Sequence, residues 1–125
     1  MIAEQLRNII KDGEGLTVEF KECRNQVNRD VYKSICAFLN RNGGHIVLGV
    51  KDNGSISGID PKALSGIKKD LVTTLNNPQK INPPLYALPE TITIEGKLLL
   101  YFAIPESSQV HRCIGKIFDR NEDGD

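Results

Sequence analysis

The sequence predicts an α/β fold of the α+β two-layer type, in which a mixed sheet packs against two main helices plus an N-terminal helix. A strand-like alternation, a helical repeat and a short apolar run follow one another between residues 16 and 50. A second amphipathic helix follows, and two later apolar runs flank the tight turn Glu95-Gly96. The 125 residues, 39% of them hydrophobic, are expected to form a single domain over residues 1–125.

The N-terminal segment predicts a helix and then a strand. Apolar residues recur at helical spacing within residues 2–11, and Asp12-Gly13 is a typical helix end. Apolar and polar residues then alternate from residue 16 to residue 21. The apolar set is Leu16, Val18 and Phe20. This period of two predicts a strand with one face in the core and a polar face that carries Glu19 and Lys21.

The clearest helix is expected over residues 29–41, where apolar side chains recur at helical spacing. Asn28 or Asp30 is available as its N-terminal cap, and Asn42-Gly43-Gly44 is a typical stop. Phe38 lies on the apolar face of this helix and is therefore expected to be buried.

The next strand is expected at the apolar residues 46–50, and Asp52-Asn53-Gly54 then makes a tight turn into a short strand at 55–57. The strands near residues 16–20 and 46–50 are expected to be neighbours in one sheet. The helix between them is expected to cover both, because all three elements carry complementary apolar faces.

The second main helix is expected to begin at Pro61 and to end before residue 76, and a linker rich in Pro and Asn follows it. Residues 91–94 and 97–104 then predict a hairpin that Pro105 terminates. Residues 114–118 are a candidate for a last strand.

Composition excludes several classes of protein. Lys+Arg 16 balance Asp+Glu 16, so the chain lacks the basic composition of a histone-like protein. No apolar run reaches the ~20 residues of a membrane span, and the N-terminus lacks the apolar region of a signal peptide, so we expect a cytoplasmic protein with no membrane partner. Three cysteines without C-x-x-C spacing predict reduced thiols, not a disulfide framework or a zinc site.

Glu19-Phe20-Lys21 is the E-x-K arrangement of metal-dependent nucleases. Alternate strand residues share a face, so Glu19 and Lys21 should project together, roughly 6–7 Å apart along the strand. The carboxylate would hold Mg²⁺ or Mn²⁺, the lysine would steady phosphate charge, and Glu14 and Asp52 would complete an acidic cluster. The alternative is a solvated ion pair on the polar face of the strand.

Basic residues between positions 20 and 80 form a candidate nucleic-acid surface. They are Lys21, Arg24, Arg29, Lys33, Arg41 and Lys51, and Lys62, Lys68 and Lys69 of the second helix would add to them if the fold brings them together. Only Tyr32 among the aromatic residues lies near this set, so contact with the phosphate backbone is favoured over base stacking. The alternative is that these charges serve solubility.

Several motifs follow one another in a fixed order. They are Leu16-Thr-Val-Glu-Phe-Lys21, Ile35-Cys-Ala-Phe-Leu-Asn40, Asn42-Gly-Gly-His-Ile-Val-Leu-Gly-Val50, Asp52-Asn-Gly54 and Gly58. This series resembles the Schlafen AlbA-type domain over nearly the whole chain, and Pro105-Glu106, Val110-His111 and Phe118-x-Arg120 resemble the closing segment of that family. The resemblance implies a single AlbA-like α/β domain, similar to the archaeal chromatin protein Alba.

The resemblance also implies a function. Such domains are usually described as DNA-binding and as the N-terminal part of longer bacterial transcriptional regulators, so DNA is favoured over RNA and further domains are expected beyond the chain. Binding would require no cofactor. Some members are described as ATPase-related, but this sequence has neither the Gly-Lys-Ser/Thr of a Walker loop nor a Rossmann G-x-G-x-x-G.

Ribonucleases of the Schlafen family bind metal and cut RNA with two glutamates around the E-F-K strand and an aspartate after the next strand. The matching acids are Glu14, Glu19 and Asp52. The resemblance also implies a second lobe, which a homodimer would supply. Three functions stay open: a nucleic-acid-binding regulatory module, which is favoured, a metal-dependent ribonuclease, and a dimerisation or scaffold domain.

Overall fold

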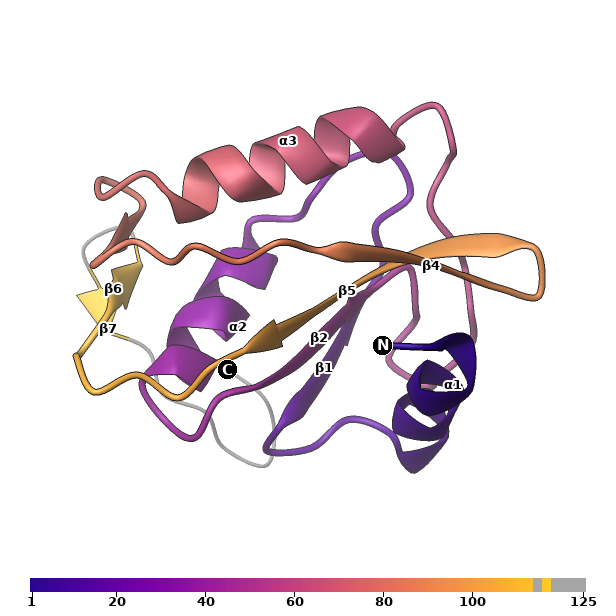
Figure 1. Ribbon diagram of the computed structural model, residues 1–125, viewed down its shortest axis with the longest axis horizontal. Coiled ribbons are helices and arrows are strands. Elements are labelled where there is room, and N and C mark those ends of the chain that lie inside the picture. Colours follow the sequence, from indigo (N-terminus) through magenta and orange to yellow (C-terminus); the bar gives the residue numbers. More distant parts are fainter. Residues whose placement is uncertain (114–115, 118–125) are drawn as a thin grey trace.

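Within the described residues, the chain folds around a four-stranded mixed sheet with helices on both faces (Figure 1). The computed structural model describes residues 1–113 and 116–117. The helices are α1 (Ala3–Asp12), α2 (Asp30–Leu39) and α3 (Leu64–Leu75). The strands are β1 (Val18–Lys21), β2 (Gly44–Leu48), β3 (Ile81–Asn82), β4 (Glu90–Ile94), β5 (Lys97–Ile104), β6 (Arg112–Cys113) and β7 (Lys116–Ile117). No helix in this part of the chain is long and apolar enough to cross a membrane.

The main sheet has the strand order β1-β2-β5-β4 and confirms the predicted mixed topology. β1 and β2 pair in parallel, with Lys21 opposite Leu48, and α2 provides the crossover that a parallel pair needs. β5 pairs antiparallel with both β2 and β4. The predicted hairpin turn is confirmed, because Glu95 and Gly96 both have positive φ angles, of 54° and 77°.

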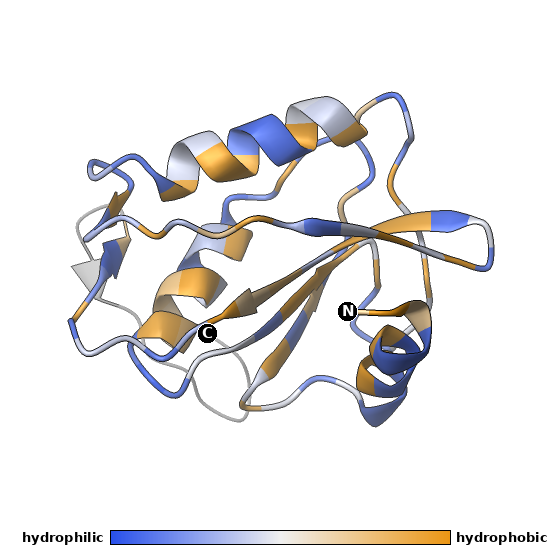
Figure 2. Cartoon of the chain, in the orientation of Figure 1, coloured by the Kyte–Doolittle hydropathy of each residue, from blue (hydrophilic) through white to orange (hydrophobic). Residues whose placement is uncertain are grey.

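Apolar clusters hold the helices to opposite faces of the sheet. On one face, α2 and α3 pack against β2 and β5; this cluster includes Ile35, Phe38, Ile46, Ile67, Leu71 and Phe102. On the other face, Leu6 of α1 packs with Phe20, Val47 and Tyr101. Figure 2 shows the hydrophobic residues that line the central strands β2 and β5. The helix between the two parallel strands therefore covers them as predicted, and Phe38 is completely buried.

The first strand is shorter than predicted. β1 begins at Val18, and Leu16 lies in the preceding loop with 46% of its surface exposed. The prediction that Leu16 belongs to the core is therefore wrong. Alternating apolar and polar residues therefore correspond to a strand only from Val18 to Lys21, where the backbone pairs with β2.

The second main helix begins later than predicted. Pro61 lies in a turn, in which the Asp60 carboxylate accepts a hydrogen bond from the Lys62 N–H (3.0 Å), and α3 starts only at Leu64. The short strand expected at 55–57 is reduced to a single bridge between Ile56 and Val50.

The linker rich in Pro and Asn contributes β3, which the sequence did not predict. It forms a small antiparallel sheet with β6 and β7, in which Ile81 lies opposite Cys113. Of the candidate last strand, residues 116–117 lie in β7, whereas 114–115 and 118 lie outside the described residues, as does Phe118-x-Arg120.

A polar clamp joins the end of α2 to the segment before β6. The Asn40 side chain donates to the His111 carbonyl (2.9 Å) and accepts from the His111 N–H (2.7 Å). The buried imidazole of His111 is hydrogen-bonded to the Ser107 hydroxyl and to the Pro83 carbonyl, each at 2.7 Å. Since both ring nitrogens have partners, the geometry supports a structural role for His111.

Candidate functional site

The candidate site lies where the parallel strands β1 and β2 end. Their carboxyl ends meet at one edge of the sheet, and α2 begins near the same edge because it connects them. A hollow of about 420 Å³, here called the strand-end cleft, lies there. It is lined by Lys21, Glu22, Asn28, Lys51, Asp52 and Asn53. Open α/β sheets commonly bind ligands at this edge, because the loops that follow parallel strands converge there.

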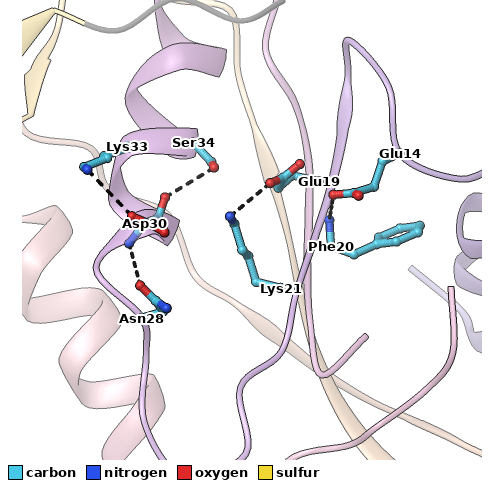
Figure 3. Close-up of polar contacts among 8 residues, drawn as sticks. All are labelled: Glu14, Glu19, Phe20, Lys21, Asn28, Asp30, Lys33 and Ser34. Atoms are coloured by element: carbon cyan, nitrogen blue, oxygen red, sulfur yellow. Dashed lines mark hydrogen bonds and ion pairs between the residues drawn. The ribbon is translucent and has the colours of Figure 1, made fainter. Parts of the chain in front are cut away.

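Glu19 and Lys21 project from β1 on the side of the sheet that α2 covers (Figure 3). Val18 and Phe20 belong to the cluster under α1, so the alternation of a strand places Glu19 and Lys21 on the opposite face. Glu19 Oε1 and Lys21 Nζ are 3.1 Å apart, which confirms that the two side chains share a face.

The ion pair considered as the alternative is present, but its carboxylate is buried and not solvated. Glu19 is only 7% exposed, and its carboxylate projects to the side of β1 on which α2 lies (Figure 3). A buried carboxylate is costly unless a cation or hydrogen bonds compensate its charge. Lys21 therefore has a structural function in addition to any contact with a ligand.

Glu14 reaches the same place from the loop between α1 and β1. β1 is an edge strand, and the loop folds back along its free edge: the Gly15 N–H donates to the Val18 carbonyl (3.1 Å), and the Phe20 N–H donates to Glu14 Oε2 (3.1 Å). The Glu14 carboxyl is also hydrogen-bonded to Glu19. The sequence indicated Glu14 as a member of the acidic cluster, but no periodic pattern could predict its contact with Glu19, since a loop separates it from the strand.

The environment raises the pKa of Glu14 to about 7. Burial is the largest cause, followed by the hydrogen bond to Glu19 and by the negative charges of Glu19 and Asp52, whereas the Phe20 N–H acts in the opposite direction. The Glu14 carboxyl therefore titrates near neutral pH, and a cation bound beside it would compete with its proton.

Asp52 completes the predicted set of acids from the turn after β2. It is exposed, and it acts on Glu14 through its charge. Among the described residues, no three Asp, Glu, His or Cys side chains are already arranged to hold a metal ion. The three acids thus lie in one region, with Glu14 and Glu19 in direct contact.

The predicted basic residues are only partly brought together. Lys21 and Lys51 line the strand-end cleft, and Arg29 lines an adjoining hollow of about 520 Å³ that shares Glu22 and Asn28 with the cleft. Arg24 is exposed on the loop between β1 and α2, which also carries Glu22, Asn28 and Arg29.

Two other predicted cations are placed differently. Lys33 lies on α2 and is 3.7 Å from the Asp30 carboxylate. Arg41 follows the C-terminal end of α2, whereas the cleft adjoins its N-terminal end, and a ten-residue helix is about 15 Å long. Arg41 therefore lies apart from the cations around the cleft.

The cleft also contains residues that the sequence did not single out as functional. Glu22 and Asn53 line it, and Asn28 both lines it and accepts the Asp30 N–H at 3.0 Å. Each follows a parallel strand or precedes the crossover helix, and this position in the βαβ order is the signal that could have identified them.

The sequence profile of the Schlafen, AlbA_2 family matches residues 14–125, which is most of the chain. The chain belongs to this family. It is 37% identical over 71 residues to an uncharacterized ATP-binding protein of Ureaplasma parvum serovar 3. That match covers 54% of this Schlafen AlbA_2 chain and 20% of the relative, so the chain spans about a fifth of the length of the curated relative it matches.

Solved structures share the fold of this Schlafen AlbA_2 domain. The N-terminal domain of an ATP-dependent DNA helicase RecG-related protein from Nitrosomonas europaea superposes with a TM-score of 0.64 and 24% identity, over 85% of this chain and 74% of that one. A protein from Corynebacterium diphtheriae superposes with a TM-score of 0.66 and 14% identity, over 98% of this chain and 29% of that one. These likenesses show the fold.

Proposed function

We propose that this domain binds nucleic acid through the phosphate backbone, with DNA preferred over RNA, as part of a transcriptional regulator. The strongest support is that Lys21 and Lys51 both line the strand-end cleft, while Arg29 lines the adjoining hollow. Membership of the Schlafen AlbA_2 family supports the same assignment, since DNA binding is its usual description. Glu22 and Asp52 also line the cleft, so we expect weak binding that depends strongly on salt.

The test measures the affinity for a DNA duplex over a range of salt concentrations. Lys51, Arg24 and Arg29 are replaced together by Ala; Lys21 is kept, because its loss would leave the buried Glu19 without its cation. The slope of log affinity against log salt should fall by on the order of one unit for each phosphate that the variant no longer neutralises.

The control removes two positive charges from the other side of the sheet. Arg7 and Lys11 are exposed on α1, and their replacement by Ala should leave the slope unchanged. If both variants alter the slope equally, the surface around the cleft is not the binding surface. Tighter binding to an RNA duplex of the same sequence would overturn the preference for DNA.

A second candidate function, metal-dependent cleavage of RNA, is favoured by the contact between Glu14 and Glu19 and by the nearby charge of Asp52. Oxygen ligands of this kind suit a hard divalent cation, and Glu14, Glu19 and Asp52 would hold Mg²⁺ or Mn²⁺. When bound, such a cation polarises phosphoryl oxygens. Lys21 would hold the phosphate and keep Glu19 ionised.

Two measurements with Mn²⁺ test the second function: the melting temperature, and cleavage of a structured RNA. Metal that binds only the folded chain should raise the melting temperature, and the rise should disappear in Glu19→Gln and in Asp52→Asn. Glu22→Gln is the control, because Glu22 lines the cleft but is not one of the three acids. Absence of both stabilisation and cleavage at millimolar Mn²⁺ would refute this function for the domain.

A further inference from the structure

The three cysteines of this chain lie in one apolar cluster but have different neighbours. All three are free thiols and are buried. The Cys23 thiol donates to the Gln26 carbonyl at 3.3 Å. Cys36 lies on α2 and Cys113 on β6, which packs against α2, and the Cys36 thiol is hydrogen-bonded to the Cys113 sulfur. Two thiols separated by 77 positions in the sequence are therefore in direct contact.

Cys113 also lines a cavity of about 260 Å³ between α2, α3 and β6. The other lining residues are Arg29, Tyr32, Thr74 and Lys80. A water molecule occupies about 30 Å³ in the liquid, so the cavity is large enough for a small polar oxidant. Two of the four neighbouring side chains are cationic, which favours an anionic sulfur there. Cys113 thus lies between a reaction partner on α2 and a cavity lined by two cationic side chains, Arg29 and Lys80.

The two thiols differ in acidity. The hydrogen bond from Cys36 lowers the pKa of Cys113, the positive charge of Lys33 acts in the same direction, and burial opposes both. The same hydrogen bond and burial raise the pKa of Cys36. Burial raises the pKa of Cys23 to about 11. Because the thiolate is the nucleophile, Cys113 is the thiol that should react first.

We propose that Cys36 and Cys113 form a peroxide-sensitive pair, which hydrogen peroxide converts into a disulfide between α2 and β6. The Cys113 thiolate attacks one peroxide oxygen, the O–O bond breaks, and hydroxide leaves, so that Cys113 becomes a sulfenic acid. The Cys36 sulfur then attacks the Cys113 sulfur, the S–O bond breaks, and water leaves with the Cys36 proton. The hydroxide released in the first step takes up a proton from solvent and becomes water. In total, two thiols are oxidised to one disulfide, and one hydrogen peroxide is reduced to two waters.

The disulfide would link elements that are distant in sequence without a large movement of the backbone. Hydrogen-bonded thiols need only a local adjustment to reach the ~2.05 Å of an S–S bond. A dithiol reductant would restore the two thiols by exchange. In a reducing compartment such a bond is transient, as is typical of redox-sensing cysteines.

The experiment treats the folded 125-residue chain with hydrogen peroxide, then unfolds it in denaturant and blocks the remaining thiols with an alkylating reagent. The intact mass and the cross-linked peptides are then measured. We expect one alkyl group per chain, at Cys23, and a cross-linked peptide that contains Cys36 and Cys113. Apart from the alkyl group, the chain should be about 2 Da lighter than the reduced chain, because the disulfide lacks two hydrogen atoms. Dithiothreitol should reverse the loss. A chain that keeps three alkylatable thiols, or a cross-link that contains Cys23, would overturn the proposal.

Two variants separate the roles of the thiols. Cys23→Ser should form the disulfide as the wild-type chain does, because Cys23 bonds to a carbonyl and not to a cysteine. Cys36→Ser should leave a sulfenic acid on Cys113 that dimedone traps. Trapping at Cys23 instead would contradict the assignment of Cys113 as the reactive thiol. The peptide map of the wild-type chain tests the proposal even if a variant fails to fold.

Discussion

Replacement of Glu14 by Gln should change how the stability of this domain depends on pH. The folded environment raises the pKa of Glu14 from 4.5 to about 7, chiefly through burial and the hydrogen bond to Glu19. The folded chain therefore binds a proton at Glu14 more tightly than the unfolded chain does. This contribution to stability is fully present below about pH 4.5 and is lost as the pH rises through about 7.

The magnitude follows from the pKa of Glu14. A rise from 4.5 to about 7 corresponds to at most about 3.4 kcal/mol, at 1.36 kcal/mol for each pKa unit. The residue Glu14 as a whole is exposed, so water screens the interactions of its carboxyl with Glu19 and Asp52. We therefore expect a loss of about 1–2 kcal/mol between pH 5 and pH 8.

Urea unfolding of the wild type and of Glu14→Gln between pH 5 and pH 8, in a buffer with a metal chelator, measures this loss. Gln cannot titrate, but its carbonyl oxygen can still accept the Phe20 N–H. The wild type should lose stability relative to the variant as the pH rises. Glu4→Gln is the control, since Glu4 is exposed in the first turn of α1. Parallel curves for the wild type and Glu14→Gln would refute the argument.

The remaining predictions concern the core and the clamp, and each is checked by urea unfolding. Phe38→Ala should cost about 3–5 kcal/mol because Phe38 is 0% exposed; a loss below about 1 kcal/mol would contradict this. Gly44→Ala should cost about 1–3 kcal/mol, since its Cβ would lie 2.5 Å from the Phe38 ring, and the cost should shrink in the Phe38→Ala background. Asn40→Ala should cost about 2–3 kcal/mol by removing both hydrogen bonds to the His111 backbone, whereas Ala at the exposed Asn42 should be nearly neutral.

The sequence by itself was sufficient for the elements whose signals are local. A period of two in β1, helical periods in α1 and α2, and a two-residue turn between β4 and β5 are visible within a few residues. Each predicts a local backbone conformation whatever the rest of the chain does. The alternation in β1 also predicted that Glu19 and Lys21 share a face. The order of motifs indicated the family, which the match over residues 14–125 confirms.

Only the tertiary structure decided which residues from distant parts of the sequence are in contact. Burial of Glu19 depends on how α2 packs, and the raised pKa of Glu14 depends on a loop that folds back along the free edge of β1. The pairing of β3 with β6 brings a Pro-rich linker and Cys113 into the core, where Cys113 meets Cys36. These are contacts between distant residues, and their energies depend on burial and separation in space. A periodic pattern reports only which face of its own element is apolar, so it could not specify the partners that give these side chains their chemistry.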